Sequence, residues 1–301
     1  MLLCALLCAA VITFAAGCES VKPAVESYPG ESAHRITVGG IEIHYFDFHP
    51  DGTQTPILWL HGYSGTAFET SYIQDHLGPE RRLIAPDLPG GGYSQKPEIE
   101  YTLEFYLEFL EEFIGAMGLS SYVLAGHSMG GLIASRFASE GPPGLERLIL
   151  IAPYGIEGAA GPIAEFLART GVLVDYGLEL HNETLVELGM RFNVFYDTDL
   201  IPQDLVSYIS LATFHTPNGV GALASITRNM IGVEHDPAFL ERIAVPTLII
   251  WGAEDRVLAY RYSAPFNRLI PGSTLQAIPQ TGHLPHVERP QVTAQIIRDF
   301  L

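Results

Sequence analysis

Gly126-His127-Ser128-Met129-Gly130 directly follows the apolar run 122–125, a pattern that predicts a strand turning sharply into a helix. The flanking glycines are needed because a side chain at either position would collide with the neighbouring strand or helix. The serine at the apex must adopt an unfavourable backbone conformation, which holds its hydroxyl above the end of a sheet. This G-x-S-x-G pattern predicts acyl-transfer chemistry, provided that a base and an orienting acid follow it in the chain.

Two later segments supply such partners. A serine hydroxyl is a weak nucleophile at neutral pH, so it needs a base within hydrogen-bond reach and a third group that orients the base. Asp255 follows the apolar strand pattern 246–251, and His283 precedes a terminal helix pattern at 290–301. The sequence therefore predicts Ser128, Asp255 and His283 as catalytic residues, in that chain order.

Each of the two partners has a neighbour that competes for its role. Glu254 is adjacent to Asp255, but only one of two consecutive carboxylates can point inward. His286 is three residues beyond His283 and lies within the approach to the terminal helix. We therefore favour Asp255 and His283.

The composition is that of an acidic globular protein. Of the 301 residues 48% are hydrophobic and 17% are charged, which provides for a large core and is atypical of disorder. Sixteen basic against 34 acidic residues give a net charge of −18 without a basic cluster, which excludes nucleic acid as an expected partner. The histidines outside the motifs have no metal-ligand spacing, and Gly90-Gly91-Gly92 lacks the Lys-Ser/Thr partner of a phosphate loop. We expect no metal and no cofactor.

The N-terminus has the pattern of an export signal. The first 17 residues carry no charge and end in small residues before Cys18, and all three cysteines of the chain lie within residues 1–18. Ala15-Ala16-Gly17-Cys18 resembles the bacterial lipobox, which implies lipid attachment at Cys18. We expect a signal at 1–18, a flexible tether at 19–34, and a membrane-anchored lipoprotein at the bacterial outer membrane or cell surface. An ordinary signal of a periplasmic or secreted protein, or an uncleaved anchor, are the alternatives.

Strand and helix patterns alternate along the rest of the chain. Expected strands are 35–38, 41–48, 56–60, 83–85, 122–125, 147–152, 246–251 and 274–278, and expected helices are 101–117, 129–139 and 290–301. This order predicts a mostly parallel sheet covered on both faces. The roughly ninety residues in between, 154–245, have helical patterns and no convincing strand, so we interpret them as a helical cap inserted into a core of 35–153 and 246–301.

Five ordered segments resemble one known family. They are 61–65 (HGYSG), 85–94 (APDLPGGGYS), the Ser128 turn, 252–257 (GAEDRV), and 282–283 with 288–290 (GH and ERP). On these motifs residues 35–301 are identified as an α/β-hydrolase. The resemblance implies a mostly parallel eight-stranded sheet with helices on both faces and an inserted helical cap.

The resemblance also implies roles for individual residues. Ser128 would be the nucleophile, His283 the base and then acid, and Asp255 the group that orients the imidazole. The backbone N–H groups of Tyr63 and Met129 would form the oxyanion hole. His61 and His127 are expected to brace their loops, and Asp87 to bind loop amides.

The substrate class is less defined. Serine at position 128 argues against branches of the family that use aspartate there. Residues 190–197 resemble a cap segment shared by monoacylglycerol-type lipases and carbon–carbon bond hydrolases. The latter bind a substrate carboxylate through a cap arginine, so Arg191 is a candidate substrate-binding residue. They usually carry asparagine where this chain has His127, which favours an esterase or lipase.

The expected function is a serine hydrolase that cleaves small acyl esters or lipid esters through an acyl-enzyme. The alternatives are a carbon–carbon bond hydrolase of ring-fission products and a non-catalytic binding module on the same fold.

Overall fold

The computed structural model describes residues 32–156, 183–231, 233 and 235–301. The expected signal, the lipid-attachment residue Cys18 and residues 19–31 of the expected tether lie outside these ranges, as do residues 157–182 of the expected cap. Within the described ranges no helix is long and apolar enough to cross a bilayer.

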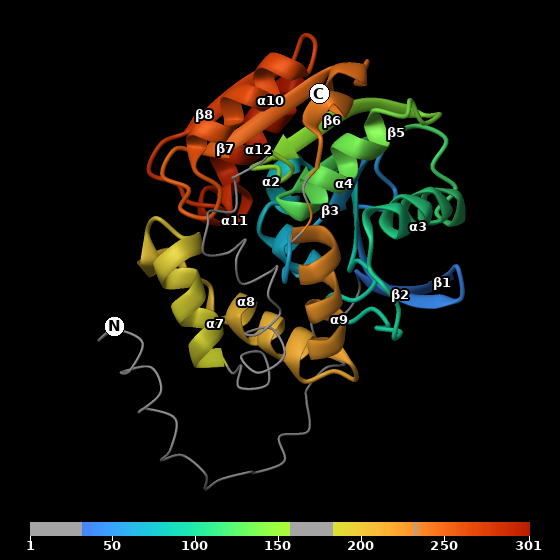
Figure 1. The fold of residues 1–301 in the computed structure, drawn as a ribbon. Helices are drawn as coiled ribbons and strands as arrows, with labels where there is room; N and C mark the ends of the chain where they lie inside the picture. The colour runs from blue at the N-terminus through green and yellow to red at the C-terminus, as the bar shows by residue number, and fades with distance from the viewer. Residues whose placement is uncertain (1–31, 157–182, 232, 234) are drawn as a thin grey trace, which may run out of the picture. The chain divides into compact units, whose positions relative to one another are not determined.

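Eight strands form one sheet in the order β1-β2-β4-β3-β5-β6-β7-β8 (Figure 1). Their bounds are β1 Ala33–Val38, β2 Ile41–Phe48, β3 Gln54–Leu60, β4 Arg81–Pro86, β5 Tyr122–His127, β6 Leu145–Ile151, β7 Thr247–Gly252 and β8 Thr274–Ile278. β2 runs antiparallel to β1 and β4, and every other pair is parallel. The predicted fold class is confirmed, although β1 begins at Ala33, so the last two residues of the expected tether belong to the sheet.

Alternating side chains of the central strands feed two apolar cores, one on each face of the sheet. In β3, Leu58 and Leu60 belong to one core while Ile57 and Trp59 belong to the other. The first core is covered by α3 (Leu103–Ala116), α4 (Met129–Ala138) and α10 (Ser263–Leu269), and the second by η1 (Ala67–Tyr72), α2 (Gln74–Leu77) and α12 (Pro290–Phe300). The central strands β5 and β7 are therefore buried on both faces, as their nearly continuous apolar sequences require.

Between β6 and β7 the described residues form helices and no strand. They are α7 Glu183–Gly189, η3 Met190–Val194, η4 Thr198–Leu200, α8 Gln203–Ile209, η5 Ser210–Phe214, α9 Gly219–Ile226, η6 Thr227–Ile231 and η7 Pro237–Arg242. The helices α7, α8 and α9 gather at one end of the sheet (Figure 1). The last helix, η7, differs: its buried Phe239 belongs to the first core and lies under the guanidinium of Arg136 from α4. This part of the expected cap thus packs with the core helices.

Two short helices complete the C-terminal part. They are η8 (Tyr260–Tyr262), which leads into α10, and α11 (Pro285–Glu288), which directly precedes α12. Because α11 starts two residues after His283, the loop that carries this histidine is short and is held between β8 and α11.

Candidate active site

Ser128 occupies the strained turn that its flanking glycines predict. Its backbone angles are φ 52° and ψ −116°, at the junction between β5 and α4. A Cβ on Gly126 would lie 2.3 Å from the carbonyl oxygen of Gly130, and a Cβ on Gly130 would lie 2.4 Å from that of Leu60. Since real Cβ atoms do not approach backbone oxygens so closely, only glycine fits at both positions, and the strain is held by the surrounding structure.

Asp255 and His283 lie in direct contact. Oδ2 of Asp255 is 2.7 Å from Nδ1 of His283, and both side chains are buried. Oδ1 of Asp255 accepts hydrogen bonds from the backbone N–H groups of Val257 and Leu258 at 2.8 and 2.9 Å. These bonds fix the carboxylate, which therefore holds Nδ1 as the protonated nitrogen and leaves the other ring nitrogen of His283 free to act as a base.

The two competing residues point elsewhere. The carboxylate of Glu254 accepts the backbone N–H of Thr281 at 3.0 Å. His286 lies on α11 with its ring against Trp59, at a centroid distance of 5.1 Å. Of the two candidate pairs, only Asp255 and His283 form an acid–imidazole contact next to Ser128.

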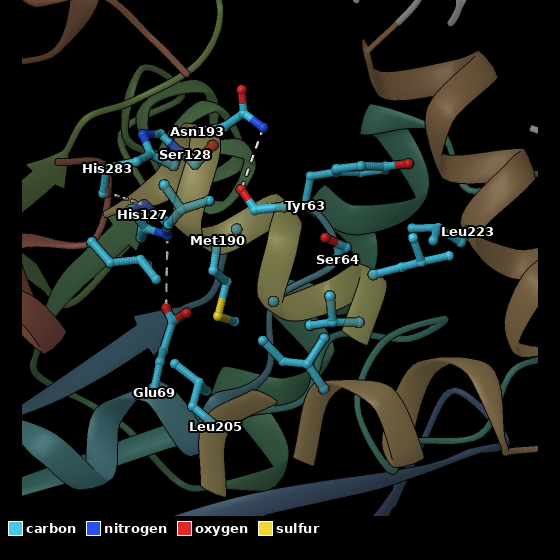
Figure 2. A pocket seen from close by; sticks show the side chains of 18 of the residues that line it. Tyr63, Ser64, Glu69, His127, Ser128, Met190, Asn193, Leu205, Leu223 and His283 are labelled. Atoms are coloured by element: carbon cyan, nitrogen blue, oxygen red, sulfur yellow. Dashed lines mark hydrogen bonds and ion pairs between the residues drawn. The ribbon is translucent and has the colours of Figure 1, made fainter. Parts of the chain in front are cut away.

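A cavity of about 350 Å³ lies between the sheet edge and the cap, and both Ser128 and His283 line it (Figure 2). Most of the other described lining residues are apolar. They include Leu185, Val186, Met190, Leu205, Ile209, Phe214 and Leu223. No Lys or Arg occurs among the described residues of the lining, whereas the carboxylate residue Glu69 does.

Of the two expected oxyanion donors, one lines this cavity and the other directly follows Ser128 in the chain. Tyr63 lines it, and Met129 is the first residue of α4, where a backbone N–H has no partner within the helix. The side chain of Tyr63 reaches the cap: Thr227 donates its only hydroxyl proton to the carbonyl of Leu223, so the Tyr63 hydroxyl donates to Thr227 Oγ1 at 2.7 Å. Burial raises the pKa of Tyr63 above its usual value.

Arg191, the candidate carboxylate-binding residue, lies on η3 but is not among the described residues of the lining. Its guanidinium pairs with Glu187 one helical turn earlier, at 3.0 Å, and its side chain is 42% exposed. The structure therefore does not bring Arg191 together with Ser128, Asp255 and His283.

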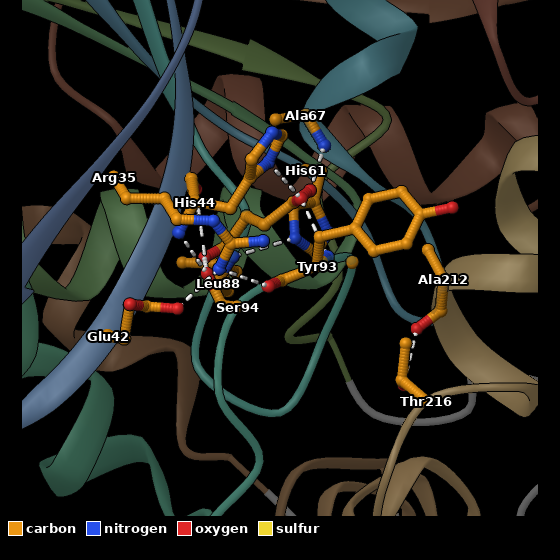
Figure 3. Close-up of polar contacts among 12 residues, drawn as sticks. Arg35, Glu42, His44, His61, Ala67, Leu88, Tyr93, Ser94, Ala212 and Thr216 are labelled. Atoms are coloured by element: carbon orange, nitrogen blue, oxygen red, sulfur yellow. Dashed lines mark hydrogen bonds and ion pairs between the residues drawn. The ribbon is translucent and has the colours of Figure 1, made fainter. Parts of the chain in front are cut away.

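Asp87 supports the loop that carries Tyr63. Its carboxylate accepts the backbone N–H groups of Ala67 and Tyr93 at 2.7 and 2.9 Å and contacts Nδ1 of His44 at 2.8 Å. Figure 3 shows these three partner residues. Burial by itself would raise the pKa of Asp87, but the hydrogen bond and charge of His44, with smaller effects of His61 and the Tyr93 amide, together outweigh burial and lower the pKa to about 2. The side chain thus binds loop amides, as the sequence predicts.

His61 braces the same loops. Its Nδ1 donates to the carbonyl of Gly62 at 2.8 Å, and its Nε2 accepts the backbone N–H of Leu88 at 2.9 Å. The ring therefore joins the end of β3 to the loop after β4.

Two carboxylates with contacts close to the site were not predicted from the sequence. Glu288 accepts the backbone N–H groups of Gly282, Tyr196 and Asp197 at 2.7, 3.3 and 2.8 Å. Its occurrence in the ERP motif was a signal of importance, but the motif does not say that the side chain turns back to the histidine loop and the cap.

The second is Glu69, on η1. It lies 3.8 Å from Nδ1 of His127 and 3.3 Å from Nε2 of His286, and it accepts the indole N–H of Trp59 at 3.4 Å. Burial, and then the charges of His283 and His286, hold the pKa of His127 well below its usual value, so this imidazole is neutral at pH 7. Nothing in the sequence pattern brings these side chains together, because they come from three separate segments.

Comparisons with known proteins show the family to which the fold belongs. The family model described as the alpha/beta hydrolase fold matches residues 55–290. An uncharacterised hydrolase of Bacillus subtilis, YugF, is 28% identical over 271 residues, which cover 89% of this chain and 97% of the relative. A 2-hydroxy-6-oxo-2,4-heptadienoate hydrolase of Pseudomonas putida is 27% identical, with coverages of 90% and 96%.

Among solved structures, a bacterial membrane phospholipase A matches with a TM-score of 0.74 and 27% identity, over 89% of this chain and 85% of that one. A thermophilic esterase from Thermogutta terrifontis matches with a TM-score of 0.74 and 26% identity, over 89% and 97%. The similar proteins thus include ester hydrolases and a carbon–carbon bond hydrolase. Since the family model spans most of the chain, the protein belongs to the α/β-hydrolase fold family.

Proposed function

We propose that the protein is a serine hydrolase of carboxylic esters. The observation that carries the proposal is the 2.7 Å contact between Asp255 and His283, beside a strained Ser128 that lines the same apolar cavity. A base fixed by a buried carboxylate next to a serine is the arrangement that activates a hydroxyl for attack on a carbonyl.

The reaction follows from these positions. His283 takes the proton of the Ser128 hydroxyl as its oxygen attacks the acyl carbon, and then gives that proton to the departing alkoxide. The negative charge that develops on the carbonyl oxygen is stabilised by the backbone N–H groups of Tyr63 and Met129. A water molecule then attacks the acyl-enzyme with His283 again as the base, which releases the acid and restores Ser128.

The cavity favours an uncharged acyl group. Its described lining is mostly apolar, has no cationic side chain, and contains the carboxylate residue Glu69. A substrate with its own carboxylate would find no Lys or Arg in the described lining to compensate for its burial. A volume of about 350 Å³ suits a short or medium acyl chain.

A chain-length series of p-nitrophenyl esters and monoacylglycerols tests the proposal. We expect turnover of short and medium esters, and we expect Ser128→Ala to lower it by about 10⁶. Ser210→Ala is the matched control, because Ser210 is also buried but makes no hydrogen bond in the described part of the chain. Wild-type turnover by Ser128→Ala would contradict the mechanism.

Carbon–carbon bond hydrolysis is the second candidate, and the similarity to the Pseudomonas putida enzyme favours it. The ion pair of Arg191 with Glu187, outside the described cavity lining, argues against it. Cleavage of a ring-fission dienoate that falls at least tenfold in Arg191→Ala would establish this activity in place of ester hydrolysis. A catalytically inactive binding module would turn over neither substrate.

We also propose that Cys18 carries a lipid that anchors the chain to a membrane, which would place the cavity near lipid esters. The lipobox-like residues 15–18 support this proposal, as does the similarity to a membrane phospholipase A. Mass spectrometry of the protein made in a bacterial host should find an N-terminal lipid adduct that Cys18→Ser removes. An unmodified Cys18 would contradict it.

A further inference from the structure

Three side chains outside the catalytic contact meet in the interior below Ser128. Glu69 comes from η1, His127 ends β5, and His286 lies on α11 (Figure 2 shows the first two). Their relative exposures are 3%, 3% and 0%. Each offers one ligand atom, and these atoms all lie within 4.8 Å of one another.

The hydrogen bonds of the cluster leave two acceptor atoms facing each other with no donor between them. Nε2 of His127 is 2.9 Å from the carbonyl oxygen of His283, which can only accept, so Nε2 carries the proton. The opposite nitrogen, Nδ1, therefore presents a lone pair, and 3.8 Å away it faces the carboxylate of Glu69, which is also an acceptor. Two facing acceptors in a buried site are stable only with a cation or a proton between them.

Three of the four histidine ring nitrogens in the cluster are also unsatisfied. In the described part of the chain Nδ1 of His127 and both ring nitrogens of His286 make no hydrogen bond, although Nε2 of His286 is 3.3 Å from Glu69. Among the residues that the structure describes, the one hydrogen bond to the carboxylate of Glu69 is the weak one from Trp59, at 3.4 Å. A buried carboxylate with so little compensation is unusual, since such groups are normally paired or bound to a metal.

We propose that Glu69, His127 and His286 form a binding site for a divalent transition-metal ion of the Zn²⁺ type. Imidazole nitrogens and a carboxylate oxygen are ligands that Zn²⁺ prefers, at about 2.0–2.2 Å. Tetrahedral ligands at that distance are about 3.3 Å apart, close to the 3.3 and 3.8 Å that separate Glu69 from the two histidines. The bond from His127 Nε2 to a backbone carbonyl is the outer contact that orients a metal-bound histidine.

The cavity supplies the fourth position. Glu69 and His127 both line it, so a water molecule can reach the ion from that side. The ion would join η1, the strand that ends at the Ser128 turn, and the helix after the His283 loop. Metal binding would thus stabilise the elements that carry the proposed catalytic residues, without any role in the ester chemistry itself.

Metal analysis after equilibrium dialysis tests the site. Chelator-treated full-length protein is dialysed against micromolar Zn²⁺, and we expect one tightly held ion per chain and a higher melting temperature. Glu69→Gln and His286→Gln should each weaken binding at least tenfold and remove the thermal shift, whereas His235→Gln, which alters a half-buried histidine remote from the cluster, should keep both. The Cys4→Ser/Cys8→Ser/Cys18→Ser variant should also keep both, because thiols do not contribute.

A Co²⁺ spectrum of the unmutated protein decides the question if the variants fail to fold. Four-coordinate Co²⁺ absorbs visible light far more strongly than six-coordinate Co²⁺, and nitrogen and oxygen ligands give no thiolate charge-transfer band. An intense visible spectrum without that band is the expected result. No bound ion, a weak six-coordinate spectrum, or equal Zn²⁺ binding by Glu69→Gln and the protein with Glu69 would each overturn the proposal.

Discussion

The backbone N–H of His283 donates to the carbonyl oxygen of Val194 at 2.7 Å. Val194 is the last residue of η3, so the cap is bonded directly to the loop that carries the proposed catalytic base. Glu288 reinforces this junction by accepting backbone N–H groups from both segments. The position of the imidazole therefore depends on the cap as well as on the sheet.

Gly282 is the point where this junction is tightest. A Cβ there would lie 2.1 Å from the carbonyl oxygen of Val194, so Gly282→Ala must push the histidine loop away from the cap. Because a displacement of about 1 Å costs roughly 10² in rate, we expect ester turnover to fall at least that far. Steady-state kinetics with a p-nitrophenyl ester measures the loss.

Gly115→Ala is the matched control for that experiment. A Cβ at Gly115 meets nothing within 4 Å, and the residue lies inside the helix α3. Alanine should raise the free energy of unfolding by about 0.5–1 kcal/mol and leave turnover unchanged. Equal turnover by both variants would mean that the contact with Val194 does not position His283.

Glu288→Ala should affect stability and catalysis together. Removal of the carboxylate leaves three backbone N–H groups without their acceptor, at a cost of about 1–3 kcal/mol for each donor that stays buried. We expect a loss of at least 2 kcal/mol in urea unfolding and a lower turnover number. Glu288→Gln keeps one acceptor oxygen, so its free energy of unfolding and its turnover number should both fall less. If Glu288→Ala changed neither quantity, water would have replaced these hydrogen bonds.

Asp255→Asn and Glu254→Gln distinguish which of the two neighbouring carboxylates orients His283. The amide oxygen of asparagine can still accept from Val257 and Leu258, so the loop should keep its fold, but its NH₂ group cannot hold Nδ1 of His283 in the protonated form. Turnover should fall by about 10⁴. Glu254→Gln should stay within a few-fold of the unaltered enzyme, because Glu254 contacts the backbone of Thr281. If Glu254→Gln lowered turnover more than Asp255→Asn did, Glu254 would be the carboxylate that orients His283.

The sequence predicts the sheet and the Ser128 turn well because their signals are local. Apolar runs and the glycines at 126 and 130 are recognised from a few neighbouring residues, and the order of the motifs is visible along the chain. The Glu69 cluster could not be predicted, since it depends on side-chain directions from three segments that the fold brings together. The same limit applies to Arg191: helical spacing allows it to face the cavity or Glu187, and the structure has the ion pair.

The lowered pKa of Asp87 predicts how the free energy of unfolding depends on pH. Its pKa of about 2 in the folded protein is below the ordinary value of 3.8, because the combined effects of His44, His61 and the Tyr93 amide outweigh the opposing effect of burial. A carboxyl group whose pKa is lower in the folded protein stabilises the fold at any pH above its pKa in the unfolded chain. This contribution is lost as the pH falls toward the pKa in the folded protein. About 2 kcal/mol should therefore be lost between pH 4 and pH 2. Urea unfolding measured at each pH should show a flatter dependence between pH 4 and pH 2 for Asp87→Asn. The control Asp51→Asn alters an exposed carboxylate and should leave this dependence unchanged. An equally steep profile for Asp87→Asn would assign the acid sensitivity to other carboxylates.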